Sequence, residues 1–421
     1  MTALSERFPT PFYAYDLELA QKRVSELLSI FPEETNPRLL YSFKSNPLPA
    51  LARAIREAGA EADLTSPGEI EAATAAGFEF SKALFGGPGN GAEEIDAAIA
   101  SGVRRFSIES WQDYEVIGAA AARANVLVQG LLRVNPAEPP KAKLAMSGVA
   151  SQFGFEEEDL LENGSRRLGQ FAEHVAVEGI HIYWGTQVGG PEELAACFEN
   201  AVQAACQISE TAGFPLKVLN FGGGFPWPYA KSGEGPDLQP LRAELKRIFE
   251  NAGAAKEADW WFESGRYCSA SSGTLVSRVM DIKDSKDRRF VILDTGIHHL
   301  GGMSGLGRIP RFAIDLIPPA ERTGELQKMD IVGQLCTPLD LLGRNQQLPE
   351  DLQIGDLVTI PNVGAYGVTG SLTGFLSRPT PLEICHRGGE VESIFQIRRG
   401  HGEVSIENFP QEPVSEALSN A

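Results

Sequence analysis

The feature that most constrains this chain is a repeated alternation of strand-like and helix-like segments between about residues 38 and 265. Each unit is a short apolar run, a loop and a stretch rich in Ala, Leu and Glu. The predicted strands are 38–44, 61–65, 82–86, 104–109, 126–134, 175–184, 216–221 and 259–263. Strands that alternate with helices pair in parallel through right-handed crossovers. Eight such strands in a segment of this length predict a closed (β/α)8 barrel of the TIM type.

The helix-like stretches carry stop signals that support this pattern. Stretches 48–59, 67–77, 92–102 and 241–253 each end in glycine, which readily adopts the left-handed conformation of a helix C-cap. An open, doubly wound sheet is the alternative fold. It is disfavoured because no GxGxxG motif follows the first strand.

After about residue 270 the pattern changes to strand-like runs separated by turns. Runs 273–283, 288–296, 357–364 and 392–399 predict a mainly antiparallel β-domain. The opening segment TPFYAYD also predicts a strand, and we expect it to join that domain. We therefore expect an α/β chain with a barrel over residues 17–269 and a β-domain formed by residues 1–16 and 270–421.

Composition excludes several classes of partner and site. The chain has 56 acidic and 37 basic side chains, a net charge of −19, which argues against nucleic acid as a partner. It lacks the run of about 20 apolar residues that a membrane span needs, and MTALSERFPT does not resemble a signal peptide. Five scattered cysteines without a CxxC motif predict a cytoplasmic protein with no metal site.

Polar residues follow several of the predicted strands. Because the C-terminal ends of barrel strands lie on one face, side chains at those ends are expected to converge there. The residues at these positions are Lys44, Asp63, Arg133, Tyr183, Thr186, Gly222, Gly223, Gly224, Glu263 and Arg266.

Lys44 and the triple glycine suggest chemistry at this face. A lysine that points into a closed pocket is desolvated, so we expect its pKa to be lowered and a neutral amine to be available. A solvated lysine at the start of a loop is the alternative. The glycines at 222–224 let the backbone approach an anion, and Arg266 favours a phosphate over the alternative of a flexible turn.

Glu263 is expected to be buried because it follows Trp260, Trp261 and Phe262. A buried carboxylate needs a cationic or hydrogen-bonding partner. That partner is either Arg266, in a structural ion pair, or a protonated ring nitrogen. A lysine for a Schiff base, a phosphate cradle and a carboxylate for a pyridinium nitrogen are together what pyridoxal phosphate requires.

With these groups in place, the sequence resembles the pyridoxal phosphate enzymes of the alanine racemase-like barrel fold. More narrowly, it resembles the ornithine/diaminopimelate/arginine decarboxylase family, over about residues 10–400. The motifs that carry the resemblance are YSFKSNP, DLTSPGEI, LLRVNP, NFGGGF, ESGR, QLCTPLD and GAYG. The resemblance implies a carboxy-lyase that acts on an L-amino acid or a derivative as a head-to-tail homodimer with shared active sites.

The resemblance also implies roles for individual residues. Lys44 would hold the cofactor covalently, and Glu263 would keep its ring nitrogen protonated. Tyr183 would stack on the ring where the family usually has a histidine. The remaining cofactor-binding residues would be Asp63, Arg133, Thr186, Gly222, Gly223, Gly224, Arg266 and Tyr366.

The resemblance places further residues in the substrate site. Cys336, from the β-domain of the other subunit, would return a proton to the substrate carbon. Thr337 stands where the family usually has an acid that grips a distal amine, so free ornithine or lysine is disfavoured. The predicted substrate-binding residues are Arg308, Thr337, Asp340 and Tyr366.

Residues 294–311 and 375–384 resemble a subgroup found with secondary-metabolite pathways. Some members of that subgroup decarboxylate an aminoacyl unit tethered to a carrier protein. Diaminopimelate decarboxylation is an alternative, although the Arg-Pro-x-x-Tyr stretch of those enzymes is not found here, and Arg308 or Arg311 would take its role. A racemase and a non-catalytic regulatory homologue are further alternatives, which Glu263 and the intact set of Lys44, Glu263 and Cys336 disfavour.

His298 and His299 are adjacent to each other. Neighbours in a strand point to opposite faces, so we expect a structural or substrate-channel role for them and not a metal site.

Overall fold

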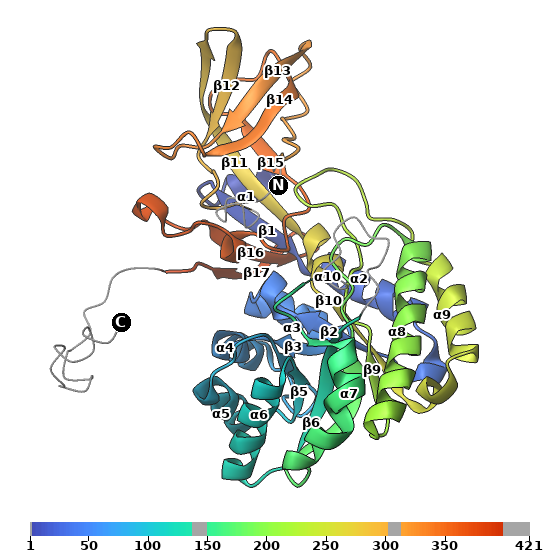
Figure 1. Cartoon of the computed structure of the whole chain (residues 1–421). Helices are drawn as coiled ribbons and strands as arrows, with labels where there is room; N and C mark the ends of the chain where they lie inside the picture. The colour runs from blue at the N-terminus through green and yellow to red at the C-terminus, as the bar shows by residue number, and fades with distance from the viewer. Residues whose placement is uncertain (1, 137–149, 302–312, 399–421) are drawn as a thin grey trace, which may run out of the picture.

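The computed structural model describes residues 2–136, 150–301 and 313–398 (Figure 1). Eight parallel strands of its described part close into a barrel, because β2 pairs with both β3 and β10 while β5 pairs with β6. These strands are β2 (Arg38–Ser42), β3 (Glu61–Leu64), β4 (Leu84–Gly86), β5 (Arg105–Ile108), β6 (Val128–Asn135), β8 (Val175–His181), β9 (Val218–Asn220) and β10 (Asp259–Ser264). The short β7 (Phe155–Glu156) pairs with β6. The predicted barrel is confirmed, and each predicted strand overlaps an observed one.

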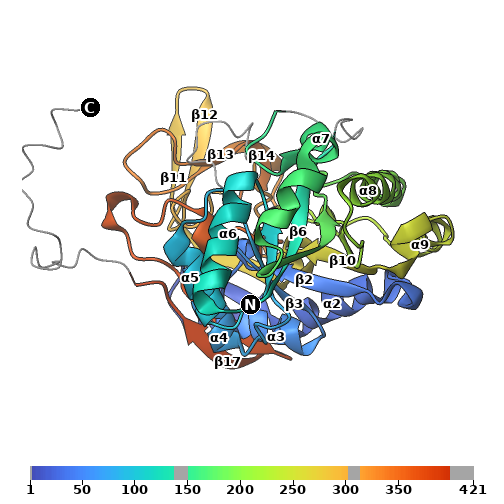
Figure 2. The same ribbon diagram turned by 60° about the horizontal axis from the view of Figure 1, so that its bottom comes forward.

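Helices surround the barrel strands, as the view from the end away from the β-domain shows (Figure 2). They are α2 (Leu17–Ile30), α3 (Pro49–Glu57), α4 (Pro67–Ala76), α5 (Ala92–Ala100), α6 (Trp111–Ala124), α7 (Glu157–Arg167), α8 (Pro191–Ala212) and α9 (Pro240–Glu250). Gly77 ends α4 at φ 80°, the left-handed C-cap that the sequence predicts. Among the described residues, no helix combines the length and the apolar character that a membrane span needs.

The barrel interior is filled by side chains. Leu40, Leu84, Leu131, Val218 and Trp261, one from each of five strands, form a buried cluster of their own. The opposite faces of these strands pack against the helices in the main core. A filled interior leaves the rim of the strands as the place for a small molecule to bind.

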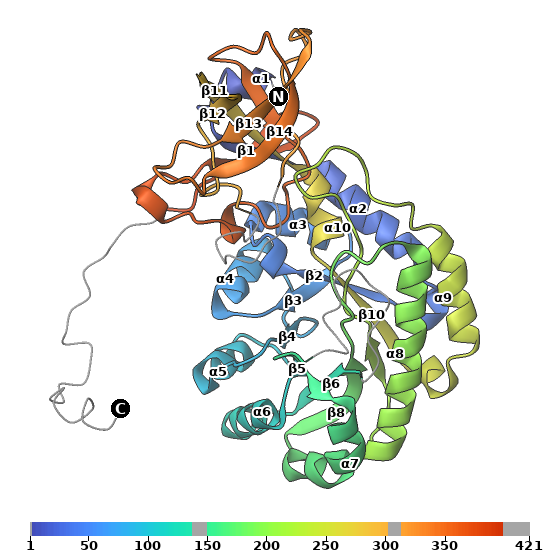
Figure 3. The same ribbon diagram turned by 45° about the horizontal axis from the view of Figure 1, so that its top comes forward.

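The second sheet is mainly antiparallel, as predicted, and lies beyond the barrel (Figures 1 and 3). Its strands are β1 (Phe12–Asp16), β11 (Gly273–Ser285), β12 (Arg288–Leu293), β13 (Leu326–Val332), β14 (Leu341–Pro349), β15 (Leu357–Ile360), β16 (Leu382–Arg387) and β17 (Glu390–Phe395). β1 lies between β11 and β16, so the opening strand joins this sheet as expected. β13, β14 and β16 are strands that the sequence analysis missed. The exact domain boundaries remain a prediction.

Hydrogen bonds tie a loop of the β-domain to the rim of the barrel. The backbone N–H of Tyr366 donates to Ser45 O at 2.7 Å, and Asn46 Nδ2 donates to Gly364 O at 2.8 Å. The Tyr229 hydroxyl donates to Tyr366 O at 2.8 Å. These contacts hold Tyr366 over the strand ends of its own chain.

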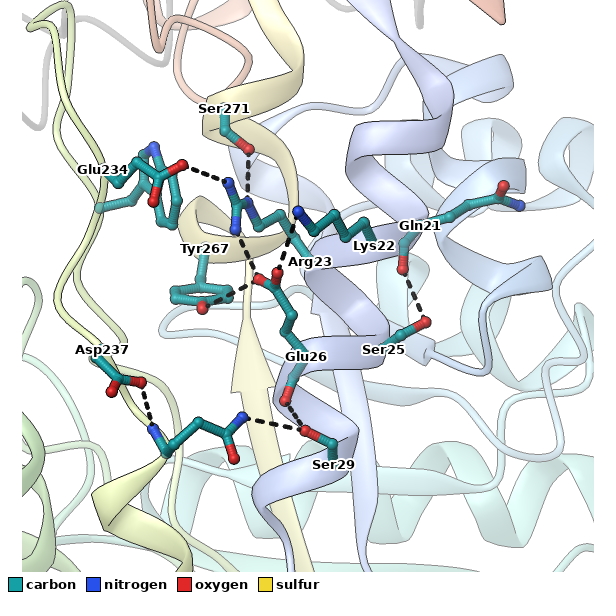
Figure 4. Close-up of polar contacts among 12 residues, drawn as sticks. Gln21, Lys22, Arg23, Ser25, Glu26, Ser29, Glu234, Asp237, Tyr267 and Ser271 are labelled. Atoms are coloured by element: carbon teal, nitrogen blue, oxygen red, sulfur yellow. Dashed lines mark hydrogen bonds and ion pairs between the residues drawn. The ribbon is translucent and has the colours of Figure 1, made fainter. Parts of the chain in front are cut away.

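The long loop between β9 and α9 is held against α2 (Figure 4). The Arg23 guanidinium lies 4.2 Å from the centre of the Trp227 ring and 3.8 Å from Glu234. It also contacts Glu26 at 2.7 Å and Ser271 Oγ at 3.2 Å. The segment that follows the triple glycine therefore has a fixed path.

We expect the variant Glu383→Gln to show that the Glu383 carboxyl group of β16 makes the stability of the fold depend on pH. Burial raises the pKa of Glu383 to about 7, although the Tyr15 hydroxyl donates to its Oε1 at 3.2 Å. A carboxyl group whose pKa is higher in the folded than in the unfolded protein adds to the free energy of unfolding at pH values below its unfolded-state pKa. This contribution is lost as pH rises through about 7. From pH 5 to pH 8.5, the free energy of unfolding of the wild type should therefore fall relative to the variant by about 1–3 kcal/mol.

Urea titrations followed by circular dichroism measure this difference. Glu390→Gln, an exposed position in the adjoining strand, is the matched control and should show no such pH dependence. Parallel pH curves for the wild type and Glu383→Gln would contradict the prediction.

Candidate functional site

A pocket that opens to solvent lies at the C-terminal ends of the barrel strands. Residues after β2, β8, β9 and β10 line it, together with one residue of the β-domain. The lining residues are Ser42, Lys44, Tyr183, Thr186, Gly223, Gly224, Phe225, Glu263, Ser264, Gly265, Arg266 and Tyr366. The structure thus brings together most of the residues that the sequence places at the barrel mouth, while their individual roles remain predictions.

Lys44 lies in a short 3-10 turn (Phe43–Ser45) directly after β2 and is exposed toward the pocket. Desolvation lowers the pKa of Lys44, but the carboxylates of Asp63 and Glu263 outweigh it, and the pKa is raised above its ordinary value. The expectation of a lowered pKa is therefore wrong for this chain without a bound ligand. The sequence alone does not show that two carboxylates gather around this amine.

Asp63, the penultimate residue of β3, is buried, and its Oδ2 has no partner among the described residues. Burial raises its pKa to about 6, the Glu263 carboxylate adds to the rise, and the Lys44 ammonium opposes it. Asp63 does not line the pocket itself but lies near enough for its charge to act on Lys44.

Glu263 is buried near the end of β10, with 5% of its surface exposed. Its Oε1 accepts a hydrogen bond from Asn220 Nδ2 at 2.8 Å and lies 3.3 Å from His181 Nε2. The Oε2 atom accepts no hydrogen bond from a described residue. An ion pair with Arg266, the structural alternative, is not found in the described part of the chain.

His181 is neutral in this arrangement. Burial lowers its pKa well below the ordinary value, and the nearby Arg133 charge adds to the shift. Its Nδ1 lies 2.8 Å from the Ser107 hydroxyl. Glu263 is therefore held by a hydrogen bond from the Asn220 amide, and the uncharged His181 imidazole lies beside it.

The triple glycine forms a bend that requires glycine. Gly222 adopts φ +62°, and a Cβ atom there would lie 2.8 Å from the Tyr183 ring. A Cβ atom on Gly223 would lie 2.9 Å from Glu263 O. The bend therefore packs its backbone directly against Tyr183 and β10, and it leaves room for a ligand on the pocket side.

Arg266 begins the short α10 (Arg266–Ser269), and its guanidinium lies 4.9 Å from the Tyr366 ring and 5.4 Å from the Tyr229 ring. Its buried Nε has no hydrogen-bond partner among the described residues. Tyr366 adopts φ +54°, a conformation that is uncommon for a residue with a large side chain. An arginine with a free N–H donor beside a glycine bend can bind an anion.

Arg133 lies at the wall of the site. Its Nη1 donates to Glu109 Oε1 at 2.6 Å, and its guanidinium lies 4.7 Å from the Phe153 ring and 6.0 Å from the Tyr183 ring. Arg133 thus forms an internal ion pair with Glu109 and also lies near Tyr183. Its contact with the cofactor remains a prediction.

The predicted site residues of the β-domain do not line this pocket of their own chain, Tyr366 excepted. Cys336 is exposed on the loop between β13 and β14, and the Thr337 hydroxyl accepts from Leu339 N at 3.3 Å. Both carboxylate oxygens of Asp340 accept backbone N–H groups, those of Ile297 and Leu335, each at 2.8 Å. Asp340 therefore anchors the loop that carries Cys336, and Arg308 lies outside the described residues.

His298 and His299 require a correction. They follow β12 in a turn instead of a strand, and their rings contact each other with centroids 3.6 Å apart. The rule of opposite faces does not apply in a turn. Burial lowers the pKa of His298 to about 3 and that of His299 to about 4, so both are neutral.

Two site residues were missed by the sequence analysis, Asn220 and His181. Both stand at the end of a barrel strand, inside motifs that were examined for their glycines and for Tyr183. The available signal was a polar residue at a strand end, two positions before an assigned residue: His181 before Tyr183, and Asn220 before Gly222.

Comparison with known proteins places the chain in a family. The profile of the pyridoxal-dependent decarboxylases, pyridoxal binding domain, matches residues 17–270. The L-glutamyl-[BtrI acyl-carrier protein] decarboxylase of Niallia circulans is 34% identical over 94% of this chain and 92% of its own length. The diaminopimelate decarboxylase of Aquifex aeolicus is 28% identical over 93% and 90%. The structure of Helicobacter pylori diaminopimelate decarboxylase complexed with L-lysine shares the fold, with a TM-score of 0.82, 24% identity and coverage of 94% and 96%.

We expect the variant Asp63→Asn to make the Lys44 amine more reactive. Among the groups that raise the pKa of Lys44, the Asp63 carboxylate has the largest effect. Without it, the fraction of neutral amine at pH 8 rises, and Lys44 should react with an amine-directed reagent up to about tenfold faster, the factor for one pKa unit. Peptide mass spectrometry of the cofactor-free protein measures the rate.

The matched control is Asp113→Asn, a buried carboxyl on α6 that does not contribute to the Lys44 shift. This variant should label Lys44 at the wild-type rate. Unchanged labelling in Asp63→Asn would contradict the proposed electrostatic coupling.

Proposed function

The chain belongs to the pyridoxal-dependent decarboxylases, and on that premise we propose that it removes the α-carboxylate of an L-amino-acid derivative in a specialised biosynthetic pathway. Amino-acid decarboxylation with pyridoxal phosphate is the activity of the family. The substrate, the residue roles and the assembly are the proposed part. The observation that carries them is the gathering of Lys44, Glu263 and the triple-glycine bend around one pocket.

The pocket fits the cofactor on three independent grounds. The Lys44 amine is exposed to the pocket and can bond covalently to an aldehyde. The glycine bend and the free Nε of Arg266 can receive a phosphate, with Thr186 and Tyr366 beside them. Glu263 leaves Oε2 for a ring nitrogen on the opposite side.

The residues of this chain set the electronic character of the site. When bound, the cofactor accepts the electron pair that is left when CO2 departs. The Glu263 carboxylate would hold a proton at the ring nitrogen, and its neighbours, the Asn220 amide and the neutral His181 imidazole, carry no competing positive charge. A carboxylate at this position favours decarboxylation over racemisation, because a protonated ring is the stronger electron acceptor.

Tyr183 provides an aromatic face within this site. Its ring packs over Gly222, with Lys44 Nζ 6.0 Å from the ring centre. Burial raises the pKa of Tyr183, and the Lys44 charge opposes that shift, so the phenol stays protonated at neutral pH. It can therefore stack on a ligand ring as a neutral group.

We propose that Cys336 acts in the pocket of a second subunit, in a homodimer with two shared sites. Cys336 is exposed and does not line the pocket of its own chain. Exposed apolar side chains lie on its loop and on a neighbouring loop, among them Leu339 at 75% and Leu376 at 49% exposure. The two loops meet at Ile297, whose N–H donates to Asp340 and whose carbonyl accepts from Leu372 N. Such a surface suits burial against another copy.

For the substrate, we propose an aminoacyl unit presented by a carrier protein. The support is the 34% identity to a decarboxylase named for a carrier-bound glutamyl substrate, over nearly the whole of both chains. Thr337 adds support, because an uncharged hydroxyl cannot form the ion pair with the distal ammonium of free ornithine or lysine that a carboxylate forms. Diaminopimelate decarboxylation is the second candidate, favoured by the 28% identity to enzymes of that name.

Purified protein with bound cofactor should release CO2 from a carrier-bound aminoacyl substrate faster than from free diaminopimelate, lysine or ornithine. Release of labelled CO2 measures the rate for each substrate. Lys44→Ala should lower turnover at least about a thousandfold because the covalent attachment point is lost. A Lys44→Ala protein that keeps wild-type turnover would defeat the assignment, and product of inverted configuration without CO2 would indicate a racemase.

Mixing two inactive variants tests the shared site. Lys44→Ala and Cys336→Ala should each be nearly inactive alone. In an equal mixture that exchanges subunits, about half of the dimers are mixed and each contains one intact site, so activity should recover to about a quarter of the wild type. No recovery in mixed dimers isolated with two affinity tags would place Cys336 outside the neighbouring pocket.

A further inference from the structure

A single buried amide contacts both the glycine bend and the Glu263 carboxylate. Asn220, the last residue of β9, is fully buried, with 0% of its surface exposed. Its Oδ1 accepts a hydrogen bond from Gly222 N at 2.9 Å, and its Nδ2 donates to Glu263 Oε1 at 2.8 Å. One side chain therefore connects the first glycine of the bend to the carboxylate.

The Oδ1 contact shapes the glycine bend. An asparagine oxygen that accepts from the N–H two residues ahead closes an Asx-turn, and here it holds Gly222 at φ +62°. On the other side of the peptide, Gly222 O accepts from Glu263 N at 2.8 Å. Both polar groups of Gly222 are thus fixed, one by Asn220 and one by β10.

The Nδ2 contact fixes one oxygen of Glu263 and leaves the other free. His181 Nε2 lies 3.3 Å from the same Oε1, and its Nδ1 lies 2.8 Å from the Ser107 hydroxyl. The imidazole is neutral, and its Nε2 makes no hydrogen bond to a described residue, so the ring packs beside Oε1 without donating to it. The Asn220 donor on Oε1, with the neutral His181 ring packed beside that oxygen, sets the direction in which Oε2 points.

We propose that Asn220 is a positioning residue that directs Glu263 Oε2 at the ring nitrogen while it holds the glycine bend in the form that receives the phosphate. This inference rests on the proposed function, since it uses the ring and phosphate ends of the cofactor. An uncharged amide suits the task, because a cationic partner would neutralise the carboxylate that has to hold a proton on the ring. Asn220 itself touches no reacting atom.

Two variants separate the two contacts. Asn220→Asp keeps an oxygen for Gly222 N but replaces the donor to Glu263 with a second carboxylate oxygen. Asn220→Leu has a similar volume and removes both contacts. Binding to the cofactor-free chain, followed by fluorescence, is measured for pyridoxal phosphate and for pyridoxal, which lacks the phosphate.

The two ligands should respond differently. Asn220→Asp should weaken both ligands by a similar factor of about 10 to 100, the usual effect of losing a hydrogen bond to a charged group. The ratio of the two affinities should stay at the wild-type value, because the phosphate end is intact. Asn220→Leu should weaken pyridoxal phosphate about a further tenfold while pyridoxal falls as in Asn220→Asp, so that the ratio drops.

A matched control distinguishes positioning from general destabilisation. Asn362 is also buried, and its Nδ2 donates to Lys231 O at 2.6 Å and Gly233 O at 3.0 Å. Asn362→Asp therefore loses buried donors and gains a charge as well. It should lower the melting temperature but leave both affinities within about twofold of the wild type.

Ser107→Ala provides a readout if Asn220→Leu fails to fold. It removes the hydroxyl at His181 Nδ1, so it acts on the carboxylate end alone. It should weaken both ligands by a similar, several-fold factor, with the ratio unchanged.

The inference is overturned if folded Asn220→Asp and Ser107→Ala bind both ligands as the wild type does. It is also overturned if Asn220→Leu lowers both affinities by the same factor, or if Asn362→Asp reproduces the pattern of the Asn220 variants. A wild-type chain that binds neither ligand would instead overturn the proposed function, and this inference with it.

Discussion

The burial of the Glu263 carboxylate is the constraint around which the pocket is organised. A carboxylate out of contact with water needs hydrogen-bond donors, and these have to come from neighbouring strands. The parallel register places the Asn220 donor and the His181 ring beside Glu263, because His181 on β8 pairs with Asn220 on β9, and Asn220 pairs with Trp261, two residues before Glu263 on β10. Backbone hydrogen bonds between three adjacent strands thus determine which side chains meet at the floor of the site.

The architecture could be predicted from the sequence because its signals are local. Strand and helix segments alternate, and glycines with positive φ follow α3, α4 and α5 as expected, although Asn251 and not Gly253 caps α9. Barrel closure follows from the number and order of the segments. Strands β13, β14 and β16 were missed because their sequences, such as LQKMDIV and LLGRNQQLP, mix apolar residues with charges and amides. Such strands are held by pairing with neighbours rather than by a continuous apolar face.

The positions of the main site residues could be predicted from the sequence, but the direction of the Lys44 pKa shift could not. Position at a strand end brought Lys44, Glu263 and the glycine bend together, since parallel strands point their ends the same way. The sign of the Lys44 shift depends on its distances from Asp63 and Glu263, which no spacing in the sequence reveals. The prediction that His298 and His299 point to opposite faces of a strand was wrong for a related reason. The two residues lie in a turn, and their rings contact each other.

The placement of β1 has a consequence for how the chain is made. Tyr13 on β1 pairs with Leu275 on β11 and with Glu383 on β16, across most of the length of the polypeptide. During synthesis from the N-terminus, the segment that forms β1 leaves the ribosome before either of its neighbours exists. The barrel can close while the β1 segment is still unpaired, so the nascent chain exposes an apolar strand until β11 and then β16 have been synthesised.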